Sequence, residues 1–157
     1  MRENIYSSPS SNLDKGYTFK GNPIKAIAIG LSISVVGSIL GAMVVGIAFG
    51  VYWASTGMRA DEIEILTKTD TSILAAYLIE SLLFSFWSGY YVAKKTNFQE
   101  FKFCFIMVLI GTILGVLLMV AMPEVYSEQP LWYTVTSFIL YPIVVINGCW
   151  LFVKSKP

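Results

Sequence analysis

The chain has 157 residues, of which 55% are hydrophobic and only 13% are charged, and its formal net charge is +1. A soluble domain usually carries about 25% charged residues, so this composition indicates a membrane protein. The near-neutral charge gives no reason to expect a nucleic-acid partner, and the absence of histidine excludes histidine-ligated haem, histidine-based zinc sites and histidine general bases.

Four long apolar runs occupy most of the chain, at about 23–53, 72–93, 103–122 and 131–153. Each is long enough to cross a hydrocarbon core of about 30 Å, which takes roughly 20 helical residues. The sequence therefore predicts an all-α membrane protein in which residues 23–157 form a four-transmembrane-helix bundle. Residues 1–22 are predicted to be a flexible cytoplasmic tail, because they are polar and lack periodicity.

Basic residues predict how the bundle is oriented in the membrane. The connection between the first and second runs and the connection between the third and fourth runs together hold only two basic residues, Arg59 and Lys68. The N-terminal tail, the connection between the second and third runs, and the C-terminal segment, each counted with the adjoining ends of the runs, hold nine: Arg2, Lys15, Lys20, Lys25, Lys94, Lys95, Lys102, Lys154 and Lys156. Basic loops stay cytoplasmic, so we predict that both termini are cytoplasmic and that the protein is a multi-pass protein of the bacterial cytoplasmic (inner) membrane.

Small residues mark the first and third runs as packing helices. In the first run they recur at every fourth position or form a neighbouring GxxxG pair: Gly30, Ser34, Ser38, Ala42, Gly46 and Gly50, with Gly37 and Gly41 as the pair. The third run contains Gly111 and Gly115. Small residues let helix backbones approach closely in lipid, where van der Waals contact drives association. The stripe in the first run fits packing against another span of the same chain or against a second copy.

The second and fourth runs are richer in aromatic and hydroxyl side chains, and the second contains Glu80, the only carboxylate or amine side chain well inside a run. A charge at that depth costs at least about 2.5 kcal/mol, so such residues usually face the bundle interior. Helical spacing puts Tyr77 on the same face as Glu80, and Ser137 and Tyr141 lie at a similar depth in the fourth run, with Asn147 nearer the cytoplasm. We predict a polar intramembrane site from these five residues. Either Glu80 binds a proton or cation, or it is a protonated acid hydrogen-bonded across helices.

Residues 55–71 contain several acidic side chains and fit either a short surface helix or an irregular loop. Cys104 and Cys149 are predicted to lie near the same membrane face as small apolar fillers, because two isolated cysteines make neither a zinc pattern nor a disulfide framework. We expect no metal and no cofactor.

Two short motifs resemble those of uncharacterised small four-helix bacterial inner-membrane proteins. The opening Asn4-Ile5-Tyr6-Ser7-Ser8-Pro9 resembles an NPYxxP start, with Ile5 in place of proline, and the segment from Ser88 to Lys95 resembles a GGYxAxR/K ending, with Ser88 in place of glycine. The resemblance implies a fold and a location but no activity.

Three classes of function remain. The first is a non-enzymatic accessory or interaction protein whose partners are the lipid bilayer and, through the first run, another membrane protein or a second copy. The second is a small transporter or channel component that uses Glu80 as a proton or cation site. Against the third, a membrane enzyme, stand the missing histidine, the absence of paired carboxylates at the inner helix ends and the lack of a nucleophile motif such as G-x-S-x-G.

Overall fold

The computed structural model describes residues 22–96 and 99–156, and within them the chain is helical almost throughout. Four helices are long and apolar enough to cross a membrane: α1 (Pro23–Ser55), α3 (Thr71–Thr96), α4 (Glu100–Ala121) and α6 (Leu131–Lys154). Two shorter helices, α2 (Ala60–Thr69) and α5 (Pro123–Ser127), connect them. The prediction of four long apolar helices is confirmed, with ends that differ by three residues at most. The predicted tail and its NPYxxP-like motif lie outside the described residues, except for Asn22.

Side-chain caps set the start of two spans. The Oδ1 atom of Asn22 accepts hydrogen bonds from the backbone N–H groups of Ile24 (3.0 Å) and Lys25 (3.3 Å), and Pro23 occupies the first turn of α1. Asp70 does the same for α3, accepting from Ser72 at 2.9 Å. Such caps satisfy backbone donors that a helix leaves free at its N-terminus.

The segment 55–71 forms a helix rather than an irregular loop. Helix α2 begins after Arg59, whose backbone N–H donates to the Glu62 carboxylate in the first turn at 3.1 Å. Its apolar side chains Ile63 and Leu66 pack against a core cluster around Trp53. The chain reaches α2 through Gly57, whose φ of 86° lies in the left-handed region that favours glycine.

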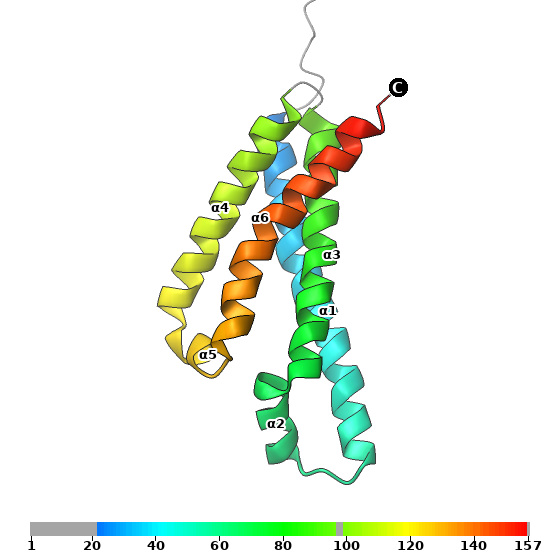
Figure 1. The fold of residues 1–157 in the computed structure, drawn as a ribbon, viewed down its shortest axis with the longest axis vertical. Coiled ribbons are helices and arrows are strands. Elements are labelled where there is room, and N and C mark those ends of the chain that lie inside the picture. The colour runs from blue at the N-terminus through cyan, green and yellow to red at the C-terminus, as the bar shows by residue number, and fades with distance from the viewer. Residues whose placement is uncertain (1–21, 97–98, 157) are drawn as a thin grey trace, which may run out of the picture.

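Helix α3 packs against both α1 and α6; in Figure 1 it lies in front of α1 and beside α6. Both α1 and α6 pack along much of its length, whereas α4 makes fewer contacts and leans away from α3 toward α5. The start of α1, the end of α3, the start of α4 and the C-terminal end of α6 gather at one end of the bundle, which we call the basic end because Lys25, Lys94, Lys95, Lys102, Lys154 and Lys156 are there. Helices α2 and α5 lie toward the opposite end, the loop end.

Each end has its own core. At the basic end, residues of all four long helices form a cluster of buried side chains: Ile27, Val92, Ala93, Cys104, Met107, Val145 and Cys149. At the loop end, a smaller cluster consists of Trp53, Ile73 and Leu74. Between the two clusters the helices meet through glycines and polar side chains, Glu80 and Ser137 among them, whereas Asn147 lies level with the cluster at the basic end.

Candidate functional site

The small residues of α1 face α3. Val92 and Met107 fill the space beside Gly30, the hydroxyls of Ser34 and Ser85 are hydrogen-bonded at 3.2 Å in a buried position, and the ring of Phe84 lies against Gly37. Through this line of contacts the small residues of the first run pack α1 against α3 of the same chain.

The same line continues toward the loop end with longer side chains from α3. The carboxyl group of Glu80 lies against Gly41 so closely that a Cβ atom there would overlap it, and the Tyr77 hydroxyl lies beside Gly46, 3.0 Å from where a Cβ would be. Gly50 has nothing within 4 Å of that position, so the contact ends before it. Ser38 and Ala42 are half-buried beside the line.

Glu80 is closed off from its surroundings. Both carboxyl oxygens are buried, and neither has a hydrogen-bond partner within residues 22–96 and 99–156. Burying an isolated charge costs far more than burying a neutral acid, so this packing accommodates the neutral carboxylic acid. The carboxyl group of Glu80 fills the space that Gly41 leaves.

The five predicted site residues lie in three different places. Glu80 and Tyr77 face α1, Ser137 and Tyr141 line a cavity between α4 and α6, and Asn147 is exposed on the outside of α6. Helical spacing correctly puts Glu80 and Tyr77 on one face of α3, but that face meets α1 rather than α6. The physical reason is that Gly41 and Gly46 leave room on α1 for two long side chains.

Helix α6 meets α3 through a second pair of glycines, which the sequence analysis did not assign to packing. The Val145 carbonyl lies where a Cβ of Gly89 would be, and the Phe86 carbonyl occupies the corresponding position beside Gly148. The Gly89 carbonyl also accepts a hydrogen bond from the Cys104 thiol at 3.5 Å. Ser85 and Gly89 are spaced as a small-xxx-small pair, which is the signal that could have identified this contact.

A cavity of about 360 Å³ lies between the loop-end halves of α4 and α6 and reaches α3 and the α5 region. Apolar atoms make most of its lining surface, although eight of the lining residues carry a hydroxyl or amide group: Ser81, Thr112, Tyr126, Gln129, Tyr133, Thr134, Ser137 and Tyr141. Phe138, Gly111 and Gly115 complete it, with the Tyr141 hydroxyl against Gly111 and the Phe138 ring 3.4 Å from the Cβ position of Gly115. Of this lining, the sequence analysis named Ser137 and Tyr141 for the candidate site and the two glycines for packing.

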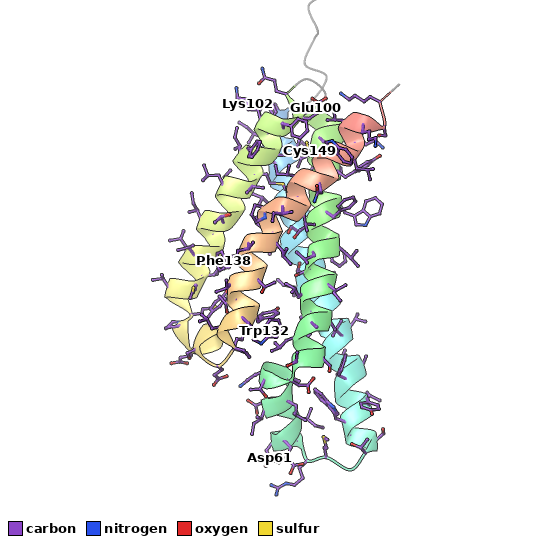
Figure 2. The ribbon with its side chains drawn as sticks, in the orientation of Figure 1. Asp61, Glu100, Lys102, Trp132, Phe138 and Cys149 are labelled. Atoms are coloured by element: carbon purple, nitrogen blue, oxygen red, sulfur yellow. The ribbon has the colours of Figure 1, made fainter. Side chains whose placement is uncertain are left out.

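Charged side chains lie at the two ends of the bundle; Figure 2 labels Glu100 and Lys102 at one end and Asp61 at the other. At the basic end Lys156 pairs with Glu100. At the loop end Lys68 bridges Glu64 (3.0 Å) and Glu128 (2.9 Å), which joins α2 to the segment after α5. Hydrogen bonds to Glu128 and then Glu64 raise the pKa of Lys68 above its usual value.

Cys104 and Cys149 are both free and buried in the cluster at the basic end, where their thiols contact each other. They lie at the same end of the bundle, as predicted, and Figure 2 labels Cys149 there. Their surroundings are those of small core side chains.

The four apolar helices define this chain as an integral, multi-pass membrane protein. No family model, curated protein or solved structure matches the chain.

Proposed function

We propose that this protein is a non-enzymatic accessory protein that binds another membrane component through the outward face of α6. The observation that carries the proposal is the position of Asn147. Its side chain is exposed within the apolar helix α6, in the half nearer the basic end, and its amide makes no hydrogen bond to any residue in the described part of the chain. Amide side chains inside membranes commonly hydrogen-bond across helices, with about 0.6 kcal/mol of stabilisation on average and up to about 2 kcal/mol.

The surroundings of Asn147 fit a partner helix. Ile143, Trp150 and Leu151 are exposed by 49%, 51% and 43%, and their spacing puts them on the same face of α6 as Asn147. The face is therefore apolar with one amide near its centre. Because the small residues of α1 already pack against α3, they are not free to bind a partner unless the two helices separate, which favours α6 over the first run as the binding surface.

The alternative is a transporter or channel component that uses Glu80 as its proton or cation site. The burial of both carboxyl oxygens against Gly41 and the absence of Glu80 from the cavity lining support a packing role instead. Replacing Glu80 by glutamine tests this alternative. Proton- or cation-dependent uptake into vesicles that is lost in folded E80Q protein would support transport, whereas a variant with unchanged behaviour supports the accessory role.

We infer that the membrane is the bacterial inner membrane and that the basic end is cytoplasmic. The concentration of lysines at that end supports this orientation.

Site-specific photocrosslinking in cells tests the partner surface. A photoreactive residue at Trp150 or Ile143 should give a crosslinked product of defined mass, and the product should be lost when Asn147→Leu is added. The matched control is the same probe at Leu117, which is exposed by 57% on α4. Equal products from Leu117, or products that persist with N147L, would contradict the proposal, and a product of twice the chain mass would indicate a second copy rather than a different partner.

A further inference from the structure

The hydroxyl groups of the cavity between α4 and α6 are not accounted for by the packing of the bundle. Ser81 and Ser137 donate to backbone carbonyls of their own helices, at 2.9 and 2.8 Å. The hydroxyls of Thr112, Thr134 and Tyr141 make no such bond within the residues that the structure describes, although all three line the cavity. At membrane depth there is little water to satisfy polar groups, so donors that face a cavity favour a ligand that accepts hydrogen bonds.

The charge of the lining indicates that the ligand is uncharged. No lysine, arginine, aspartate or glutamate lines the cavity in the described part of the chain. Acidic residues border the lining. Glu80 is next to Ser81 and interacts electrostatically with Tyr133, while Glu124 and Glu128 lie in α5 and just after it, where they would repel a phosphate group; Glu128 is already paired with Lys68. A phosphate head group would be left without a cation, and an ammonium group without a free carboxylate in the lining.

The position of the cavity favours a lipid over a soluble molecule. Its lining comes largely from two spans, α4 and α6, and the residues next to the lining on the outer faces of these helices are exposed and apolar, including Ile113 (51%), Val135 (46%) and Ile139 (56%). Entry from the hydrocarbon region is therefore open to an amphiphile. The volume of about 360 Å³ lies in the lower part of the range of small-molecule sites, which suits a head group and the first carbons of its chains.

We propose that this cavity binds the head of an uncharged, hydroxyl-bearing lipid of the diacylglycerol class. The free hydroxyls of Thr112 and Thr134 hydrogen-bond the glycerol hydroxyl and the ester carbonyls, and Phe138 with Gly111 and Gly115 contacts the start of the acyl chains. The tails remain in the bilayer. The site is separate from the surface of Asn147, which does not line the cavity, so the two proposals can fail independently.

The test uses the full chain in phosphatidylcholine nanodiscs with two photoactivatable probes that carry the same acyl diazirine, one a diacylglycerol and one a phosphatidylcholine. The diacylglycerol probe should label peptides of α4 and α6, and unlabelled diacylglycerol should compete. Each hydroxyl removed should weaken labelling about fivefold, so T112V/T134V should lose labelling by more than about tenfold. The matched control T136V changes a threonine of α6 that does not line the cavity and should keep full labelling.

Three outcomes would overturn the assignment. Equal labelling of α4 and α6 by both probes would show occupancy by any acyl chain, and unchanged labelling in T112V/T134V would show that the hydroxyls do not bind the head group. Competition by free glycerol as strong as that by diacylglycerol would assign the site to a soluble polyol. Competition on the wild-type chain needs no variant, so it decides between these ligands even if the double variant does not fold.

Discussion

At the scale of single residues, the glycines of this bundle have different roles that their spacing alone does not reveal. Gly89 and Gly148 allow backbone-to-backbone contact between α3 and α6, because a carbonyl group lies where each Cβ would be. Gly41 instead makes room for the carboxyl group of Glu80, and Gly50 borders open space. The loss of folding free energy when a glycine is replaced by alanine should therefore depend on what occupies the Cβ position: rigid backbone, a flexible side chain, or open space.

The first prediction compares Gly148→Ala with Gly50→Ala. The new methyl group of G148A would overlap the Phe86 carbonyl, and since neither backbone can rotate away, α3 and α6 must separate; overpacking of this kind typically costs about 1–3 kcal/mol. G50A should be neutral or stabilising by up to about 1 kcal/mol, because alanine is the better helix former. Unfolding free energies measured by steric trapping in bicelles would show the difference, and equal losses in both variants would contradict the structure.

A second prediction concerns the contact between Gly41 and Glu80. G41A alone should be destabilising because its methyl group overlaps the carboxyl group, whereas E80A alone removes a side chain that has no hydrogen-bond partner in the described residues. In the double variant, the methyl group added by G41A occupies the space that the Glu80 carboxyl group fills in the unaltered chain. A double-mutant cycle on unfolding free energy should therefore give a coupling of about 0.5–3 kcal/mol in favour of the double variant, and additive losses would place the Glu80 carboxyl elsewhere.

At the scale of elements, the four spans could be predicted from hydropathy because lipid leaves few alternatives to a helix. The neighbours of each helix face could not. Spacing places Glu80 and Tyr77 on one face of α3, but whether that face meets α1 or α6 depends on where a second helix has space, and that is a property of the assembled bundle. The cavity was missed for the same reason, since its hydroxyls come from separate spans and form no pattern in any one of them.

The element with the clearest testable contact is α2, which Lys68 joins to the segment after α5. Lys68 forms ion pairs with Glu64 and Glu128, and all three side chains are partly exposed. Salt should therefore screen the attraction that joins α2 to the segment after α5. The pKa of Lys68 is raised in the folded protein by its hydrogen bonds to Glu128 and Glu64. The link is therefore complete below the usual lysine pKa and is lost as the pH rises through the raised value.

The third prediction follows from this geometry. A zero-length carbodiimide reagent should join Lys68 to Glu128 at neutral pH, because the two groups already form an ion pair at 2.9 Å. Mass spectrometry should find the crosslinked peptide pair in dilute salt, much less of it in about 1 M salt, where the screening length falls to about 3 Å, and none in E128Q. Crosslinking of Lys68 to Glu64 alone would show that α2 and the α5 segment are not held together.

At the scale of the whole molecule, an even number of long helices returns the chain to the end where α1 begins. The start of α1, the end of α3, the start of α4 and the end of α6 share the basic end, whereas α2 and α5 share the loop end (Figure 1). Aromatic rings accompany several of the lysines there: Lys154 lies 4.9 Å from the ring centre of Trp150, and Lys95 lies 5.9 Å from that of Tyr91. Paired basic and aromatic side chains are typical of a membrane interface.

The fourth prediction is the orientation itself. A fluorescent protein fused after residue 157 should fluoresce and alkaline phosphatase fused there should be inactive, because the proposed orientation places the basic end in the cytoplasm; phosphatase inserted between α1 and α2, at Arg59, should be active. Neutralising Lys94, Lys95 and Lys102 leaves six basic residues against two, so the orientation should persist. Adding lysines beside Arg59 while those three are neutral should produce a mixed population, since charge bias alone then sets the direction of insertion. Active phosphatase at residue 157 of the unaltered chain would reverse the assignment of both ends, and with it the side of the membrane nearest the hydroxyl-lined cavity.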